Sequence, residues 1–163
     1  MISWELRATE VAHYYNPAYV GRLLKEFINA YENEKPEGVP YELTFIALPL
    51  VILKSFRLAL PRTIRTQLHN WIEENSDYKV EFAATVKELI PIVKETLIFL
   101  LQKNLLIIND NGKLVIGSER LNRKYHRDTE EILESIDKAK FMGKWFAKAG
   151  EVTTIYALWG IRP

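Results

Sequence analysis

The segment KETLIFLLQKNLLIINDNGKLVIG, residues 94–117, decides the fold because a leucine-rich helical pattern runs directly into two short β-rich segments. These two segments flank Asp110-Asn111-Gly112, a composition typical of the turn in a β-hairpin. A helix followed at once by a hairpin is the layout of a winged-helix domain. The sequence therefore predicts a mostly α (α+β) fold: a helical domain with a winged-helix-like unit and a short β-hairpin.

The residues before the hairpin complete the predicted winged-helix-like unit, which spans about 57–117. Residues 80–104 have a helical pattern that Pro91 interrupts. Pro61 is predicted to open a preceding helix that continues through about Glu74, because proline is favoured at the first helical position. The apolar residues Ile64, Leu68 and Trp71 are expected to form the inner face of that helix.

The N-terminal flank, residues 1–56, is predicted to contribute two further helices. Asn16 and Pro17 are a good N-cap and first helical residue, and an apolar stripe at helical spacing follows them. The stripe ends before the charged loop at residues 32–42. The apolar segment LTFIALPLVILK, residues 43–54, is interpreted as a buried helix that is kinked or restarted at Pro49.

The C-terminal flank, residues 118–163, is predicted to hold one long helix from about Thr129 to Ala149. Asp128 or Thr129 would cap its start, and Gly150 would stop it. A narrow apolar seam follows the helical spacing and contains two small residues suited to close helix packing; it consists of Ile132, Ile136, Ala139, Gly143 and Phe146. The last segment is predicted to be a short helix capped by Thr153, or else a strand, and Gly160 favours the helix.

Length and composition predict a single domain over residues 1–163 in a soluble, cytoplasmic protein. Apolar residues make up 48% of the 163 positions and charged residues 26%, which is ordinary for a globular protein. The longest apolar run, residues 45–53, is far shorter than the roughly 20 residues of a spanning helix. No signal peptide is apparent, so no membrane association is expected.

The sequence contains no motif that predicts catalysis, a metal site or a cofactor. There is no cysteine, no glycine-rich phosphate loop and no HExxH motif. His13, His69 and His126 are far apart, and none has a second histidine three or four residues away. The triplet His126-Arg127-Asp128 lacks the asparagine that a kinase catalytic loop needs five residues on. We therefore expect a protein that is not an enzyme.

A basic segment is the most informative feature for function. No Asp or Glu occurs between Leu43 and Ile72, whereas Arg57, Arg62 and Arg65 fall within or just beside LPRTIRTQLHNW. Three interpretations remain open for this segment: a solvated helix face, a surface that docks on an acidic protein, or a phosphate-binding surface. The net charge of +1 means that any such role must come from local clustering.

The composition of the winged-helix-like unit argues against sequence-specific reading of DNA. The helix before the hairpin is apolar on nearly every side, which predicts burial in its own core or against a partner. The tip of the hairpin carries Asp110 and Asn111 rather than basic residues. Contact with DNA is therefore expected only indirectly or through phosphates. The excess apolar surface of this helix, or the 132–146 seam, makes a homodimer possible.

The ordered set of segments resembles the middle component of bacterial ABC-ATPase three-component systems, a family linked to conflict and antiphage defence. The resemblance is carried by NPAY at 16–19, LPLVILKSFRLALPRTIRTQLHNWIEEN at 48–75, KETLIFLLQKNLL at 94–106, GKWFAKAG at 143–150 and IYALWGIRP at 155–163. These segments cover nearly the whole chain in the same order. No single one of them is decisive by itself.

The resemblance implies a non-catalytic adaptor that bridges a large SMC-like or Rad50-like ABC ATPase and a third component. It implies no catalytic site, and the residues themselves predict no cofactor and no metal. The candidate partner-binding residues are Arg57, Arg62 and Arg65 of the basic segment, together with Trp159 and Arg162 of the last segment. The alternative is a stand-alone winged-helix DNA-binding regulator.

Overall fold

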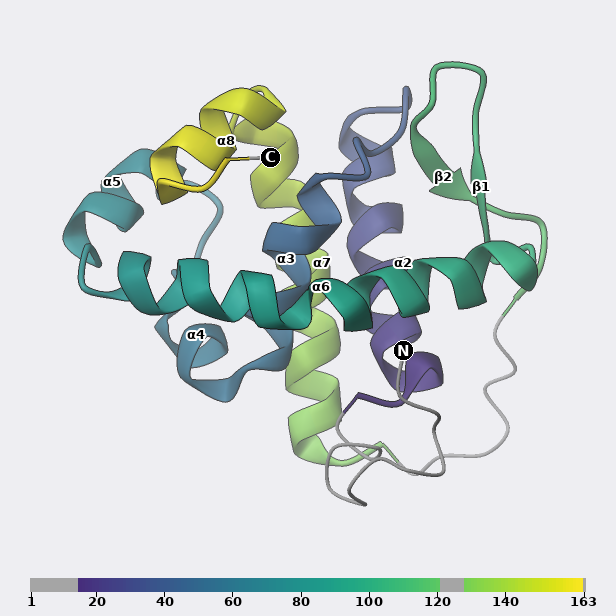
Figure 1. The fold of residues 1–163 in the computed structure, drawn as a ribbon, viewed down its shortest axis with the longest axis horizontal. Helices are drawn as coiled ribbons and strands as arrows, with labels where there is room; N and C mark the ends of the chain where they lie inside the picture. Colours follow the sequence, from purple (N-terminus) through teal and green to yellow (C-terminus); the bar gives the residue numbers. More distant parts are fainter. Residues whose placement is uncertain (1–14, 121–127, 163) are drawn as a thin grey trace.

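The computed structural model describes residues 15–120 and 128–162. It confirms the mostly α fold with one short β-hairpin (Figure 1). The elements in chain order are α2 (Pro17–Glu34), α3 (Leu43–Ile52), α4 (Lys54–Ala59), α5 (Leu68–Glu74), α6 (Tyr78–Gln102), β1 (Leu106–Ile108), β2 (Leu114–Ile116), α7 (Glu130–Lys148) and α8 (Val152–Trp159).

Helix α2 begins where the sequence predicts. The side chain of Asn16 accepts a hydrogen bond from the amide of Ala18 at 2.9 Å, and Pro17 is the first helical residue. The predicted apolar stripe is buried, with Val20, Leu23 and Leu24 fully inside the core. The helix continues through Glu34, so it extends three residues into the segment that was expected to be a loop.

Helices α2 and α7 form the central pair of the fold and lie side by side (Figure 1). The predicted seam on α7 faces α2, and Gly143 marks the closest approach. A Cβ atom at position 143 would collide with the carbonyl oxygen of Phe27 and would lie 2.8 Å from the Cβ of Ala30. Only glycine therefore permits this packing. Four of the five seam residues are buried within the chain, and Ile132 is partly buried.

The break after α3 lies at Leu53, so the expectation that the helix restarts at Pro49 is wrong, whereas a kink at Pro49 stays a prediction. Helix α3 continues through Pro49, and Leu53 is extended with φ −80° and ψ 120° before α4 begins at Lys54. Proline removes only one hydrogen bond from a helix that is otherwise held by its buried neighbours. The chain turns instead where Arg57 donates to the last carbonyl groups of α3.

The prediction that Pro61 opens a helix is also wrong, because α5 begins at Leu68. Residues 61–67 form turns, and Ile64 is the one apolar side chain between Arg62 and Gln67. Such a segment has too little apolar surface to bury as a helix. Two of its carbonyl groups accept hydrogen bonds from α7 instead. The expected inner face is partly confirmed, since Leu68 and Trp71 are buried and Ile64 is partly buried.

Helix α6 is a single helix of 25 residues that passes through Pro91, where the sequence predicts an interruption. Pro91 and Lys87, whose carbonyl group loses its helical partner, are both exposed to solvent. Water can therefore satisfy that carbonyl group. The helix packs across α2 and α3 (Figure 1).

The predicted hairpin is confirmed, and its turn depends on Asn109. The side chain of Asn109 accepts hydrogen bonds from the amides of Asn111 and Lys113, both at 3.0 Å. Gly112 adopts φ +72°, a conformation that glycine reaches without strain. Strand β2 packs on α2, and β1 follows α6. The interpretation of residues 57–117 as a winged-helix-like unit stays a prediction.

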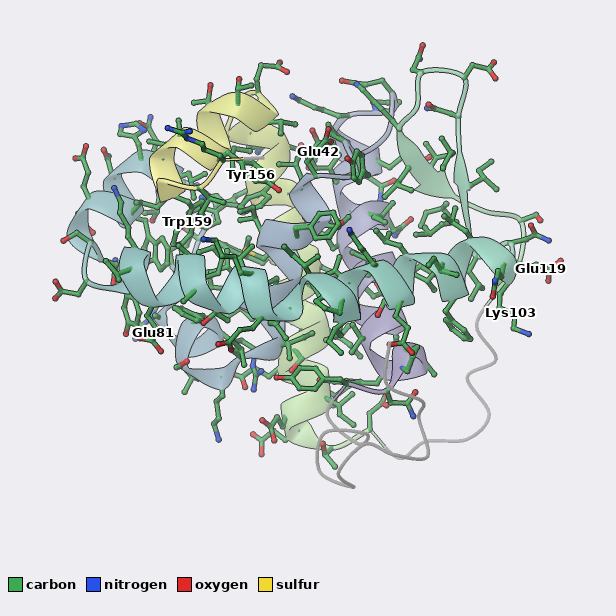
Figure 2. All side chains as sticks on the ribbon, in the orientation of Figure 1. Glu42, Glu81, Lys103, Glu119, Tyr156 and Trp159 are labelled. Atoms are coloured by element: carbon green, nitrogen blue, oxygen red, sulfur yellow. The ribbon has the colours of Figure 1, made fainter. Side chains whose placement is uncertain are left out.

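The end of the described chain is helical, as Gly160 indicates. Thr129 caps α7, because its hydroxyl group accepts from the amide of Ile132, and Gly150 follows the helix with φ +105°. Helix α8 begins at Val152, so the expectation that Thr153 caps it is wrong. The hydroxyl group of Tyr156 donates to the carbonyl oxygen of Glu42 at 2.7 Å, which ties α8 to the start of α3 (Figure 2).

Burial raises the pKa of Tyr156 to about 12, and the same cause raises the pKa of Tyr31 to about 12. Both phenol groups are therefore neutral across the physiological pH range.

Among the described helices, none combines the length and the apolar character that crossing a membrane requires.

Candidate partner-binding surface

Arg57 lies in the interior of the molecule, where it holds the end of α3. Its side chain is 1% exposed, and its Nη1 donates hydrogen bonds to the carbonyl oxygens of Val51 and Ile52, both at 3.0 Å. These carbonyl groups belong to the last turn of α3 and lack helical partners. The guanidinium group therefore caps the helix and meets the negative end of its dipole.

Two carboxylates of α7 complete the surroundings of Arg57. Nη2 lies 3.0 Å from Oε1 of Glu131, and Nε lies 3.4 Å from Oε2 of Glu134. The two glutamates are one helical turn apart, so they converge on one guanidinium group. All three nitrogens of the guanidinium group thus have partners within the chain, and Arg57 is not presented at the surface.

Residues 61–67, which we name the arginine loop, are fixed on α7 at both ends. Nζ of Lys138 donates to the carbonyl oxygen of Pro61 at 3.4 Å, and Nε1 of Trp145 donates to that of Thr66 at 2.6 Å. Lys138 and Trp145 are seven residues apart, which is about two turns of one helix face. The loop consequently lies along α7, and Arg62 and Arg65 are both exposed.

An open depression of about 400 Å³ separates the arginine loop from one face of α7. The α7 residues at its wall are spaced i, i+3, i+4 and i+7, as one helix face requires. Ile64 and Phe141 supply its apolar surface. We name this feature the basic depression; it is lined by Arg62, Thr63, Ile64, Asp137, Lys140, Phe141 and Lys144.

The basic depression carries more positive than negative charge. Three of its side chains are cationic, Arg62, Lys140 and Lys144, whereas Asp137 is its one acid. Lys140 also lies 3.9 Å from a carboxylate oxygen of Glu26 on α2. Within residues 15–120 and 128–162, no carboxylate lies within ion-pair distance of Arg62, Arg65 or Lys144. Their charge remains available to an external anion.

Lys138 supports the loop and does not add to the exposed charge. Burial lowers the pKa of its ammonium group, and the nearby carboxylate of Glu134 partly offsets this effect. The ammonium nitrogen lies 5.3 Å from the centre of the Phe141 ring, within the range of a cation–π contact. The side chain thus connects the arginine loop, the aromatic wall of the depression and α7.

Carboxylates of the charged segment at residues 32–42 serve contacts with the hairpin. Oε2 of Glu32 accepts a hydrogen bond from the amide of Ile116, and Glu37 lies 3.9 Å from Lys113. Glu32 thus fastens the hairpin to the last turns of α2, and Glu37 fastens it to the loop that follows.

The candidate residues of the last segment lie in two different environments. Trp159 is 2% exposed, and its ring centre lies 4.1 Å from that of Phe82 and 5.9 Å from that of Trp71. Arg162 is exposed. The structure therefore brings Arg62 and Arg65 together on one loop, buries Arg57 and Trp159, and leaves Arg162 at the end of the described chain.

Sequence reasoning missed the α7 side of the basic depression. Lys140, Phe141 and Lys144 were not candidates, although their spacing within DKAKFMGK places them on one helix face. That they face the arginine loop depends on tertiary contacts across the chain. His69 is exposed on α5, and His13 and His126 lie outside the described residues. The described residues hold no group of three or more acidic or histidine side chains arranged for a metal ion.

A second open depression, of about 450 Å³, lies where α6 ends, near Lys103 and Glu119 (Figure 2). Its charged side chains are of mixed sign, because Glu119 stands beside Lys103 and Arg120. The basic depression holds three cations beside its one acid, against two cations beside one acid here, and both of its walls are anchored. This difference makes the basic depression the stronger candidate for binding.

A family model described as ABC-three component (ABC-3C) system Middle Component 3 matches residues 4–163. No curated protein and no solved structure matches the chain significantly.

Proposed function

Because the chain belongs to the Middle Component 3 family of ABC-three component systems, we propose that it is a non-catalytic adaptor subunit within a bacterial antiphage defence complex. In this role it bridges an SMC-like or Rad50-like ABC ATPase and a further component. The family name supports membership in an assembly of several components. The bridging role and the identity of the partners are the content of the proposal.

The observation that carries the proposal is the charge of Arg62 and Lys144 in the basic depression, which no carboxylate among the described residues pairs with. Its cations are presented by a loop with two anchors and by a helix packed into the core, so they are held in place before any partner arrives. Such preorganisation reduces the entropic cost of binding. The surface suits a partner segment that places carboxylates against the arginine loop and an apolar side chain on Phe141.

Arginine is well suited to this contact. Its planar guanidinium group stays charged and pairs with a carboxylate through two parallel hydrogen bonds. The lysines on α7 add point charges that steer an acidic segment towards the depression. Asp137 at the same site opposes a continuous phosphate track, which favours an acidic protein over DNA.

The proposal is tested by measuring the affinity of the chain for the ATPase component of its own system. Replacing Arg62 and Arg65 together by alanine is expected to raise the dissociation constant at least thirtyfold, since truncating an interfacial charge costs about 2–5 kcal/mol. The matched control replaces Lys87 and Lys94, two exposed cations on α6, by alanine and should leave the affinity unchanged. An unchanged affinity of the double arginine variant would contradict the proposal.

DNA binding by the purified chain distinguishes the adaptor from the alternative function, a stand-alone winged-helix DNA-binding regulator. The adaptor proposal expects the isolated chain to bind duplex DNA weakly and without sequence preference. Tight, sequence-dependent binding by the chain alone would favour the regulator. Turnover of ATP by the pure chain, abolished by a point substitution within it, would contradict the non-catalytic role.

A further inference from the structure

The acid of the basic depression, Asp137, has no partner within the part of the chain that the structure describes. Its side chain is exposed and forms no hydrogen bond or ion pair among residues 15–120 and 128–162. Lys140, its neighbour one turn further along α7, lies 3.9 Å from Glu26 of α2 instead. Asp137 therefore neutralises none of the cations beside it by direct contact.

The described contacts give Asp137 no part in holding the fold together. It lies about two turns into α7, which begins at Glu130, so it is too far from the helix start to stabilise the helix dipole. Lys138 and Trp145, the anchors of the arginine loop, bind backbone carbonyl groups without using Asp137. The charge of Asp137 consequently acts on whatever enters the depression, whose wall it helps to form.

The charges of the depression are ordered along α7. Asp137 and Lys144 are seven residues apart, so they lie about two turns, or roughly 10 Å, apart on one helix face. Phe141 lies between them, and Ile64 of the arginine loop adds to the apolar middle. The α7 wall therefore has an acidic end, an apolar middle and a basic end.

Arg62 lies on the loop side of the acidic end, because the adjacent Pro61 is bonded to Lys138, the residue after Asp137. Arg62 and Asp137 line the same depression without forming an ion pair. A segment that carries charges of both signs can pair with both residues. A purely acidic segment would pair with Arg62 and be repelled by Asp137.

We propose that Asp137 pairs with a lysine or arginine of the partner segment and fixes the direction of that segment, an inference that rests on the proposed adaptor function. The segment places its basic residue at Asp137, an apolar side chain on Phe141 and a carboxylate at Lys144. A segment lying in the reverse direction brings like charges together at both ends. Asp137 is thus a specificity-determining residue, whereas the cations supply most of the attraction.

The direction in which Asp137→Asn changes affinity tests the inference. The substitution keeps the size of the side chain and makes the depression more positive. A purely acidic segment would bind this variant more tightly than the natural chain. The proposed segment should bind it about fivefold more weakly, because an ion pair is lost. Titration calorimetry against the ATPase component at constant salt measures the difference. Asp137→Lys should lose more affinity than Asp137→Asn, because like charges then face each other.

Two control variants separate the ion pair from other effects of the substitution. Asp137→Glu keeps the charge and should keep the dissociation constant within about twofold of the natural value. Glu88→Gln removes an exposed acid of α6, so it gives the same change in net charge and should leave the affinity unchanged. Thermal melts of all variants should match the natural chain, since both positions are exposed.

Three outcomes would overturn the inference. The first is an affinity of Asp137→Asn that is unchanged or higher, and the second is an equal loss in Glu88→Gln, which would reduce the effect to net charge. Both leave the adaptor proposal standing, provided that the double alanine variant of Arg62 and Arg65 loses affinity. The third is natural affinity in that double variant, which would contradict the binding site itself.

Discussion

Arg57 and the arginine loop lie a few residues apart in the sequence, yet their cationic side chains have opposite environments. Arg57 is enclosed and binds two helix-end carbonyl groups and two carboxylates. Arg62 and Arg65 are exposed, and no carboxylate among the described residues pairs with them. A basic segment in the sequence thus contains residues of two kinds, one that stabilises the fold and others that are available to a partner.

The comparison also separates two effects of a charged side chain on the free energy of unfolding. A buried charge must retain its partners, because losing them leaves desolvated groups unsatisfied. An exposed charge keeps its water, so its removal has little effect on folding. Substitutions can therefore test the contrast directly through the free energy of unfolding.

The largest effect is expected at Arg57. Replacing Arg57 by alanine removes both hydrogen bonds from Nη1 to α3 and should lower the free energy of unfolding by about 3–5 kcal/mol. Urea denaturation with an unchanged m-value measures this loss. Arg57→Lys is the informative control, because it keeps the charge but lacks the planar guanidinium group. Its free energy of unfolding should lie between those of the natural chain and Arg57→Ala. A loss below about 1 kcal/mol would remove the distinction between Arg57 and the arginine loop.

The next largest loss of unfolding free energy is expected at Trp145, which anchors the arginine loop to α7. Trp145→Phe retains an aromatic ring among Trp71, Phe141 and Phe146 but loses the hydrogen bond to Thr66. A loss of about 2 kcal/mol in unfolding free energy is expected from the missing donor and the smaller ring. Affinity for the ATPase component should fall as well, since the loop is then less well positioned. Thr66→Ala is the control, because it keeps the backbone carbonyl group that accepts this hydrogen bond. Its loss of unfolding free energy should be smaller than that of Trp145→Phe.

A smaller effect is expected from the carboxylates beside Arg57. Glu131→Gln and Glu134→Gln keep the shape of the side chains and remove their charges. Both glutamates are partly exposed, at 49% and 37%, so together they should contribute about 1 kcal/mol. Denaturation of the double variant at low and at high salt checks this value. A loss as large as that of Arg57→Ala would mean that the ion pairs, rather than the cap on α3, hold Arg57.

The smallest effect on stability is expected in the arginine loop itself. The double alanine variant of Arg62 and Arg65 should unfold within about 0.5 kcal/mol of the natural chain, because surface substitutions away from packed features rarely do more. A thermal melt recorded beside the binding measurement provides the check. A clearly lowered melting temperature with unchanged binding would show that these arginines stabilise the fold.

Local signals in the sequence predicted the elements whose causes are local. The cap at Asn16, the turn at Asn109–Lys113 and the glycine stop at Gly150 depend on residues close in the chain. The small residues in the α7 seam also predicted close packing, because a glycine at helical spacing within an apolar stripe has few other uses. These features could be read without knowing the partner helix.

The errors arise where distant contacts decide the structure. The helix expected from Pro61 is replaced by a loop because its carbonyl groups bind Lys138 and Trp145 of α7. Arg57 was assigned to a surface because Glu131 and Glu134 are 74 and 77 residues away in the chain. Half of the basic depression belongs to α7 for the same reason. Local periodicity carries no information about which helix will cover a given segment.

The close approach at Gly143 has a consequence for the synthesis of the protein. The apolar face of α2 is made early, whereas its covering helix α7 begins at Glu130, after most of the described chain. At about 5–20 residues per second, roughly 5 to 20 seconds separate the two helices on the ribosome. During that interval α3 and α6 can cover their sides of α2, but the side around Phe27 and Ala30 lacks its native cover. We therefore expect the nascent chain to need protection by a chaperone until α7 emerges.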